Sequence, residues 1–344
     1  MDSIRGWCAA AWAVLACGPA GAFELAASWP DAAAVADIAV QDVTFPSHSP
    51  FALRDVDRGP RADPPTLAQA RLVLPPGASA SDPAPAVVLL HGASGVLEAR
   101  EMTYARQFAA MGVAALVVDV FGARRDPDDD FVARLLRITE AMFLADAFAA
   151  LDYLRTRPEI DARRVALIGF SYGGMVATLA EFEQVAESFA PDGARFAAHV
   201  AFYAPCLATF EDARATGAPL LMLYGGRDAS VDAERCAEVA AQVVAGGGRV
   251  DTAVYPEAVH QWDGRFDGPR PIGRNLAPCR LEVERDGTVR DTLTFLPMSN
   301  GLFRRVILAL CADGEGYLIG RDDGVRARSN LDMGRFLAGV FAGP

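Results

Sequence analysis

Short apolar runs alternate with longer amphipathic stretches over most of the chain, and this alternation restricts the fold more than any other feature of the sequence. Seven runs have the length and composition of strands buried on both faces, at residues 70–75, 86–91, 113–119, 165–170, 198–204, 220–225 and 251–256. Helical patterns occupy residues 100–111, 131–157, 172–187, 233–245 and 331–341. Strands that alternate with helices in this way predict an α/β fold, with a doubly wound, mostly parallel sheet covered by helices on both faces.

Three segments interrupt this rhythm. Residues 46–66 and 75–86 are rich in Pro, Ser and Ala, which predicts loops that link early, antiparallel strands to the main sheet. Residues 264–330 read as an insertion before the last helix, because "RLEVERDGTVRDTLTFLP" alternates like a hairpin around Asp286-Gly287 and "GYLIGRDDGVR" suggests a further short strand and turn. We therefore expect one catalytic domain over residues 23–344 that contains this insertion.

The first residues have the order of a secretory signal peptide. Arg5 precedes an apolar run at residues 7–17, and a Gly-Pro break and an Ala-Gly-Ala sequence follow, which predicts cleavage after Ala22 and a periplasmic or secreted protein. The apolar run is shorter than the roughly 20 residues of a membrane-spanning helix. Two alternatives stay open: a buried N-terminal helix, and a lipoprotein signal with Cys17 as the lipidated residue, which a bulky leucine two positions earlier disfavours.

Export changes how the cysteines are interpreted. Outside the signal the chain has four, an even set in an oxidising compartment, and four cysteines permit three pairings. We expect neighbours to pair, Cys206 with Cys236 and Cys279 with Cys311, because the latter two bracket a loop-rich stretch; free buried thiols are the alternative. None has the C-x-x-C spacing of a zinc or redox site. The cysteines therefore do not indicate a metal cofactor.

The charge balance narrows the class of ligand. The chain is 52% hydrophobic and has a net charge of −12, which argues against nucleic acid as a partner, because binding phosphates requires a basic face. A small-molecule substrate is favoured, and the sequence does not indicate an oligomeric state. The acidic run at residues 126–130 is interpreted as the cap of the helix that follows, with Asp130 at the N-cap, rather than as a calcium loop, whose ligands occupy alternate positions.

The pentapeptide Gly169-Phe170-Ser171-Tyr172-Gly173 fits G-x-S-x-G at the junction of a strand and a helix. In this motif the chain turns sharply and presents the serine at the apex of a strained bend. The flanking glycines remove Cβ atoms that would clash in so tight a turn. Ser171 is therefore predicted to be a nucleophile, with a glycine-rich turn that carries an incidental serine as the alternative.

A serine hydroxyl needs a base, and the chain has four histidines. His48 lies in a polar loop, His91 ends a strand, and His199 sits inside an apolar strand, where a hydrogen-bonded core imidazole is expected. His260 follows the last predicted strand of the sheet, late in the chain, where the order Ser, then Asp or Glu, then His requires the base. His260 is the predicted base, and His91 is expected to shape its loop.

The orienting acid and the oxyanion donors follow from the same logic. Asp228 lies in the loop after the strand at 220–225 and is the predicted acid, whereas Asp232 is better explained as a helix cap. One oxyanion donor is expected to be the backbone N–H of Tyr172, the residue after the nucleophile. The second is expected in "LLHGASGV", where the Ala93 amide is best placed and Ser94 is next.

Five stretches, "HGASGV", "ALVVDVFGAR", "GFSYGG", "YGGRDASV" and "YPEAVHQWD", together resemble the dienelactone hydrolase family of α/β-hydrolases over about residues 69–264 and the final helix. The resemblance implies the α/β-hydrolase fold with a sheet of about eight strands, no cofactor, and hydrolysis of esters or lactones through an acyl-enzyme. The founding enzymes have cysteine where this chain has Ser171, and a glutamate where Gly92 stands, so their thiolate chemistry does not transfer.

Substrate contacts are less specified. In this family a pair of arginines can hold a substrate carboxylate, and Arg124 or Arg125, with Arg265, lie in comparable loops; a surface arginine paired to the acidic run is the alternative for Arg124. Trp262 and Tyr172 are candidates to line an acyl pocket, with core packing as the alternative. The insertion is expected either to form a lid or to decorate the sheet edge.

The predicted function is a serine hydrolase that acts on a carboxylic ester or lactone. Two other classes share the fold. A peptidase of the prolyl oligopeptidase type usually has an additional propeller domain, for which the N-terminal part of this chain is too short. A non-catalytic ligand-binding protein would be expected to lack a member of the Ser-His-Asp set, and all three residue types are present.

Overall fold

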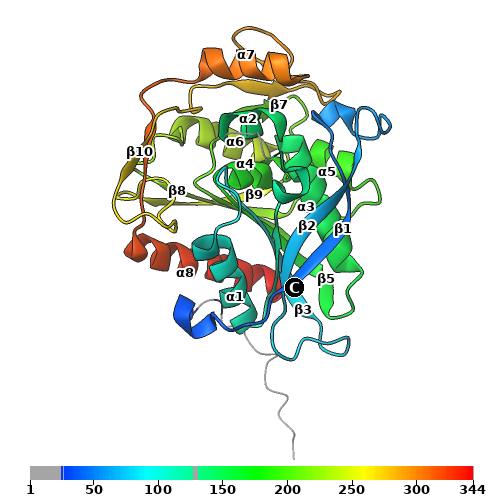
Figure 1. Ribbon diagram of the computed structural model, residues 1–344, viewed down its shortest axis with the longest axis vertical. Coiled ribbons are helices and arrows are strands. Elements are labelled where there is room, and N and C mark those ends of the chain that lie inside the picture. Colours follow the sequence, from blue (N-terminus) through cyan, green and yellow to red (C-terminus); the bar gives the residue numbers. More distant parts are fainter. Residues whose placement is uncertain (1–24, 26, 127–130, 344) are drawn as a thin grey trace, which may run out of the picture.

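The computed structural model describes residues 25, 27–126 and 131–343, and its centre is an eight-stranded sheet (Figure 1). In spatial order the strands are β1 (Gln41–His48), β2 (Pro65–Val73), β4 (Ala114–Val118), β3 (Ala84–Leu90), β5 (Ile160–Phe170), β6 (Ala198–Phe202), β8 (Pro219–Gly225) and β9 (Arg249–Tyr255). β1 and β2 run antiparallel to their neighbours, and the strands from β4 to β9 are parallel. The predicted sheet, with about eight strands and an antiparallel beginning, is confirmed.

Eight helices lie in the described part of the chain: α1 (Thr103–Ala110), α2 (Phe131–Arg137), α3 (Glu140–Arg155), α4 (Tyr172–Leu179), α5 (Glu183–Phe189), α6 (Ala233–Ala245), α7 (Gly301–Cys311) and α8 (Asp323–Phe341). α1 and α8 share one face of the sheet, where Tyr104 donates a hydrogen bond to Asn330. α3, α4 and α5 pack together on the opposite face. This arrangement buries both faces of the parallel strands, as a doubly wound sheet requires.

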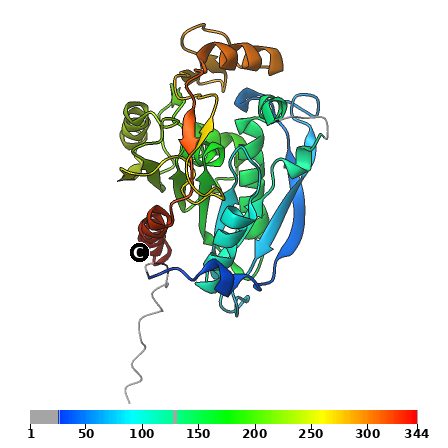
Figure 2. The same ribbon diagram turned by 60° about the vertical axis from the view of Figure 1, so that its left-hand side comes forward.

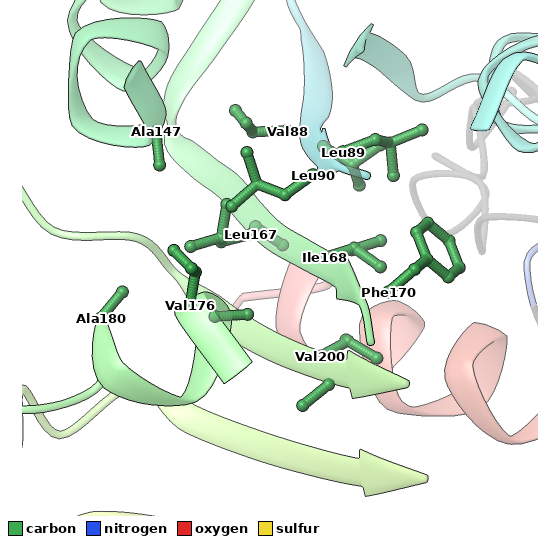
Figure 3. Close-up of a cluster of buried hydrophobic side chains, with 14 of the residues drawn as sticks. Val88, Leu89, Leu90, Ala147, Leu167, Ile168, Phe170, Val176, Ala180 and Val200 are labelled. Atoms are coloured by element: carbon green, nitrogen blue, oxygen red, sulfur yellow. The ribbon is translucent and has the colours of Figure 1, made fainter. Parts of the chain in front are cut away.

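The apolar strands explain why the centre of the sheet is rigid. Figure 3 shows side chains of β3, β5 and β6 packed with residues of α3 and α4. The labelled residues, Val88, Leu89, Leu90, Ala147, Leu167, Ile168, Phe170, Val176, Ala180 and Val200, are all essentially inaccessible to solvent. Each fully buried valine, leucine, isoleucine or phenylalanine contributes roughly 1.5–3 kcal/mol to folding. The end of β5 is thereby held in place, and the predicted nucleophile follows it directly.

The segment predicted as an insertion, residues 264–330, contains small strands, α7 and the start of α8, because the last helix begins at Asp323 and not at the predicted residue 331. β11 (Leu281–Val283) and β12 (Val289–Asp291) form the predicted hairpin, and β11 also pairs with β7 (Ala208–Phe210). β10 (Arg270–Ile272) pairs with β13 (Tyr317–Ile319). Figure 2 shows α7 at the outer end of this segment, away from α8.

Both predicted disulfides are confirmed. Cys206 is bonded to Cys236 of α6, and Cys279, just before β11, is bonded to Cys311 at the end of α7. The loops they close span 30 and 32 residues, so each restricts the unfolded chain by roughly 3–4 kcal/mol in the chain-entropy model.

Several helix boundaries differ from the prediction. The single helix expected over 131–157 is two, because the chain is extended at Thr139 (φ −100°, ψ 171°) between α2 and α3. The helix expected over 172–187 is likewise divided into α4 and α5. The predicted signal peptide at residues 1–22 and the predicted cap Asp130 lie outside the described residues. No helix in the described ranges is long and apolar enough to cross a membrane.

Candidate active site

Ser171 stands at the junction of β5 and α4 in the left-handed region of backbone space, with φ 54° and ψ −110°. A residue with a Cβ atom adopts this conformation only at a cost, of order 1–3 kcal/mol, and such outliers cluster at functional sites. The backbone N–H of Ser171 donates to the carbonyl of Phe202 at 2.9 Å, which anchors the turn to β6. The structure therefore has the sharp strand-to-helix bend that the motif predicts.

Glycines permit this bend because the backbone packs against itself. A Cβ atom added to Gly169 would lie 1.9 Å from the carbonyl oxygen of Gly173. A Cβ atom added to Gly173 would lie 2.5 Å from the carbonyl oxygen of Leu90, at the end of β3. Both distances are far inside van der Waals contact, so neither position accepts a side chain without a shift of the backbone.

The fold brings Ser171, His260 and Asp228 together from three distant parts of the chain. Ser171 Oγ lies 2.8 Å from His260 Nε2, and His260 Nδ1 lies 2.7 Å from Asp228 Oδ2. Asp228 follows β8 and His260 follows β9, so both loops lie at the same edge of the sheet as the end of β5. All three side chains are buried or nearly so, which strengthens the hydrogen bonds between them.

Ser230 joins this set, and the sequence analysis missed it. Its hydroxyl lies 2.6 Å from Asp228 Oδ1 and 2.9 Å from His260 Nδ1, and its backbone N–H donates to Asp228 Oδ1 at 2.9 Å. Because the hydroxyl proton is donated to the carboxylate, the hydroxyl lone pairs face the imidazole, and Nδ1 is assigned as protonated. An Asp followed two residues later by Ser is the spacing of an Asx turn, which was the available signal.

The loop after β3 lies directly against the nucleophile turn. A Cβ atom added to Gly92 would lie 3.4 Å from Ser171 Cβ and 3.1 Å from the carbonyl oxygen of Phe170. Ala93 follows Gly92, with Ser94 next to it and exposed to solvent. Tyr172 is the first residue of α4, so its N–H has no carbonyl within the helix to bind. The two amides predicted as oxyanion donors thus belong to backbone segments in contact with each other.

The hydroxyl of the Tyr172 side chain contacts α7. Arg304 of α7 donates to the Tyr172 hydroxyl at 3.2 Å and forms a two-pronged ion pair with Glu140, at 2.7 and 2.9 Å. Burial alone would raise the pKa of Glu140, but Arg304 outweighs burial and holds it below its usual range. Tyr172 therefore connects the inserted segment to α3 rather than lining an open acyl pocket.

Arg124 was predicted to contact substrate or to sit on the surface, and both interpretations are wrong. Its guanidinium is buried and forms a two-pronged ion pair with Asp146 of α3, at 2.6 and 2.9 Å. It also donates to Ser49 Oγ and to the carbonyl of His48. These contacts tie β1 to α3 and leave Arg124 no donor directed at the active site.

Trp262, predicted either to line an acyl pocket or to pack in the core, is a core residue. It is fully buried, and its indole Nε1 donates to Ser329 Oγ of α8 at 3.0 Å. Its ring packs edge-on against Tyr203 and Tyr255. The sequence shows that Trp262 lies in the loop after His260, but it does not show which way the indole points, so the two interpretations could not be separated.

A buried polar network lies behind the imidazole. Tyr203, whose ring is 4.7 Å from that of His260, donates its hydroxyl to Asp263 at 2.6 Å and receives a hydrogen bond from Arg100. Arg100 is fully buried and paired with Glu101 at 2.7 Å. This network supports the His260 side of the site, and the sequence carried no motif that indicated it.

Among the described residues, His260 is the histidine whose ring hydrogen-bonds to Ser171, and the other three have different partners. His91 is buried, and its Nδ1 hydrogen-bonds to the carbonyl of Gly92, in agreement with the predicted role in that loop. His48 is paired with Asp63. His199 is buried in β6 with Nε2 3.2 Å from Glu181 Oε2; burial lowers the pKa of His199 to about 3 and raises the pKa of Glu181 to about 8.

Within the described ranges no cluster of His, Cys, Asp and Glu has the composition of a metal site.

A model of the dienelactone hydrolase family matches residues 69–268, which is more than half of the chain. The chain belongs to the dienelactone hydrolase family. The match begins within β2 and ends shortly after His260, so it contains the whole cluster around Ser171 and leaves out most of the inserted segment. Members of this family hydrolyse ester bonds, and the protein is accordingly a hydrolase that acts on esters, with a small-molecule substrate.

Relatives of this dienelactone hydrolase family member agree with that assignment. A protein of Salmonella typhimurium, provisionally assigned as a carboxymethylenebutenolidase, is 26% identical over 202 residues, which cover 54% of this chain and 71% of its own. An Escherichia coli K12 protein with the same provisional assignment is 25% identical over 198 residues, covering 54% of this chain and 69% of its own. A solved dienelactone hydrolase-like promiscuous phosphotriesterase from metagenomic libraries superposes with a TM-score of 0.57 at 21% identity, over 88% of this chain and 99% of that one, which establishes the likeness of fold.

Proposed function

We propose that the protein is a serine hydrolase that cleaves a carboxylic ester or lactone through an acyl-enzyme on Ser171, with His260 as general base and Asp228 as orienting acid. One observation carries the proposal: an unbroken line of hydrogen bonds, 2.8 Å from Ser171 to His260 and 2.7 Å from His260 to Asp228, begins at a serine held in a strained strand-to-helix turn. These distances lie within the reach that proton transfer requires.

The chemistry follows from these positions. Ser171 Oγ attacks the ester carbonyl carbon while its proton passes to His260 Nε2, and Asp228 stabilises the imidazolium that forms. Collapse of the tetrahedral intermediate breaks the bond to the leaving oxygen, which takes the proton from Nε2; in a lactone this oxygen stays attached to the acyl group. Water then attacks the acyl carbon while His260 Nε2 takes one of its protons. The bond to Ser171 Oγ breaks, Oγ takes that proton back from Nε2, and the carboxylic acid is released.

The negative charge of the intermediate requires donors. The backbone amides of Ala93 and Tyr172 are proposed for this role, supported by the contact of the Gly92 loop with Ser171 and by the position of Tyr172 at the start of α4. Ser94, exposed beside Ala93, is proposed as a substrate contact.

The experiment is hydrolysis of p-nitrophenyl esters of increasing acyl length, followed by lactones and prolyl anilides. Ser171→Ala and His260→Ala are expected to lower kcat by about 10⁴-fold or more. Ser188→Ala, a serine of α5 whose hydroxyl donates to the carbonyl of Gln184, is the matched control and is expected to retain wild-type rates. Full activity of Ser171→Ala on an aryl ester would refute the proposal.

Labelling with a fluorophosphonate separates the remaining classes. Covalent modification at Ser171 supports the serine hydrolase. Preferential cleavage of prolyl anilides over esters would instead identify a peptidase of the prolyl oligopeptidase type. Absence of both labelling and turnover would identify a ligand-binding protein on the same fold.

We further propose that the chain is exported, to the periplasm or the medium, after cleavage near Ala22. Two disulfides among the described residues favour an oxidising compartment. Fractionation of the native host, followed by N-terminal sequencing of the mature protein, tests this: a first residue of Phe23 is expected, and a lipid-linked N-terminus at Cys17 would establish the lipoprotein instead.

A further inference from the structure

The inserted segment, residues 264–330, contacts the two loops that carry His260 and Asp228. In Figure 1 its yellow and orange ribbon runs along one side of the molecule, from β10 up to α7 and back down to α8. This segment lies almost wholly outside the part of the chain that matches the family. Its contacts are therefore not implied by the match to the family.

The first contact is with the backbone of the histidine. The N–H of His260 donates to the carbonyl of Leu318 in β13 at 3.0 Å, and the carbonyl of His260 accepts from the N–H of Gly320 at 3.0 Å. Both backbone polar groups of His260 are thus bound by the inserted segment. Because β13 also pairs with β10, the histidine is fixed to a small sheet rather than carried on an unsupported loop.

The second contact is with the imidazole. The ring of Tyr317, in β13, lies 5.0 Å from the ring of His260 at an interplanar angle of 77°. Tyr203, after β6, makes a similar edge-on contact at 4.7 Å. Two aromatic rings therefore confine the imidazole, and such contacts add to packing energy and limit rotation. Burial, with a contribution from Asp228, raises the pKa of Tyr317 to about 12, so its hydroxyl is neutral at physiological pH.

The third contact is with the loop of the acid. Asn275 is buried and its side-chain amide donates to the carbonyl of Ala229, between Asp228 and Ser230, at 2.6 Å. The backbone of Asn275 is paired in both directions with Asp313, at 3.3 and 3.0 Å. The Cys279–Cys311 disulfide lies just inside this pair in sequence, so it links covalently the two chain segments that carry Asn275 and Asp313.

We propose that the inserted segment is a positioning element of the active site: Tyr317 and β13 hold the imidazole of His260, and Asn275 holds the loop of Asp228. The proposal rests on the catalytic roles of Ser171, His260 and Asp228 given above. Proton transfer depends on hydrogen-bond geometry, and a misplacement of about 1 Å lowers turnover by about 100-fold. Asn275 and Tyr317 touch no reacting atom and act through Asp228 and His260.

Variants of the full chain test this on p-nitrophenyl acetate and on labelling by a fluorophosphonate. Tyr317→Ala and Asn275→Ala are each expected to lower kcat and the labelling rate by about 10- to 100-fold, with KM changed less than about threefold. Tyr317→Phe keeps the ring and is expected to restore most of the loss. Leu310→Ala, an exposed residue of α7 in the same segment, is the matched control. Thermal unfolding of each variant establishes that it is folded.

The decisive measurement compares the effect of each variant in the wild-type protein with its effect in His260→Ala. In His260→Ala the residual rate does not depend on where an imidazole sits, so adding Tyr317→Ala or Asn275→Ala is expected to change it less than twofold. Equal losses in both backgrounds, or unchanged kcat in the wild-type background, would overturn the positioning role. If His260→Ala itself retained wild-type turnover and labelling, the proposed function would fail, which is a distinct result.

Discussion

The hydroxyl oxygen of Ser230 lies 2.9 Å from Nδ1 of His260, at the nitrogen that does not face Ser171. Ser230 thus accepts, together with Asp228, the hydrogen bond from the N–H at Nδ1. We predict that Ser230→Ala lowers kcat by about tenfold with little change in KM, because the loss of one hydrogen bond in a charged network costs about 1.5 kcal/mol. Ser230→Thr keeps the hydroxyl and is expected to recover most of the rate. Steady-state kinetics on an aryl ester measure both.

Gly169 is predicted to be intolerant of any side chain. In Gly169→Ala the new methyl group would lie 1.9 Å from the carbonyl of Gly173, so the nucleophile turn must shift, and both folding yield and turnover are expected to fall severely. Gly339 is the matched control, because it lies in α8 with nothing within 4 Å of an added Cβ. Gly339→Ala is expected to raise the free energy of unfolding by about 0.5–1 kcal/mol, measured by urea denaturation.

The ion pair between Arg304 and Glu140 joins residues 164 positions apart and holds α7 onto α3. Arg304→Leu leaves Glu140 without its cation, and we expect a loss of roughly 3 kcal/mol in the free energy of unfolding. Arg304→Leu combined with Glu140→Leu is expected to recover most of that loss, because no uncompensated charge remains. Equal destabilisation of the single and double variants would contradict this account.

The buried Glu181 makes stability depend on pH. Its pKa is about 8 in the folded protein, because of burial, against an ordinary value of 4.5, so the folded state binds more protons than the unfolded state between these values. Stability from Glu181 is therefore fully present below about pH 4.5 and is lost as pH rises through 8. We predict that Glu181→Gln gains a few kcal/mol relative to wild type between pH 5 and pH 9, at about 1.4 kcal/mol per pKa unit. A difference between the two proteins that does not vary with pH would count against it.

The two disulfides are predicted to differ in their effect on activity. Replacing Cys206 and Cys236 with serine is expected to lower the free energy of unfolding by roughly 3–4 kcal/mol and leave kcat of the folded protein unchanged. Replacing Cys279 and Cys311 is expected to have the same effect on stability and also to lower kcat, because the segments that carry Asn275 and its partner Asp313 are no longer linked covalently beside that pair. Turnover at a temperature where both variants are folded distinguishes them.

The core of the fold was predictable because buried parallel strands have an unmistakable composition. All seven predicted strands are present in the sheet, and α6 has the predicted bounds. The prediction that all seven are buried on both faces is wrong for β2, which is antiparallel and half-exposed, and for the edge strand β9, which is largely exposed. The breaks at Thr139 and after Leu179 were not predicted, because in each case tertiary contacts end one helix and begin another within an apolar stretch. α7 was missed although Asn300 caps it, since the surrounding Pro, Ser and Asp suggested loop.

The residues of the candidate site likewise fall into those that the sequence predicted and those that it did not. The strand-helix turn and the order of Ser171, Asp228 and His260 along the chain are local or topological signals, and the structure brings these residues together. Arg124 was misassigned because its partner, Asp146, is on a helix that only the fold brings near. The roles of Tyr317 and Asn275 depend on how the inserted segment meets the loops of His260 and Asp228, which no sequence pattern reports.

At Ser171 the need for a hydroxyl group conflicts with the need for an unstrained backbone. Only glycine occupies φ 54° without penalty, yet glycine has no hydroxyl, so the chain retains a costlier residue at its central bend. Ser171→Gly is then a change that abolishes turnover and makes the protein harder to unfold, whereas Ser171→Ala abolishes turnover without that gain. A homologue that no longer needs the Ser171 hydroxyl for catalysis is therefore expected to gain thermal stability through this one substitution.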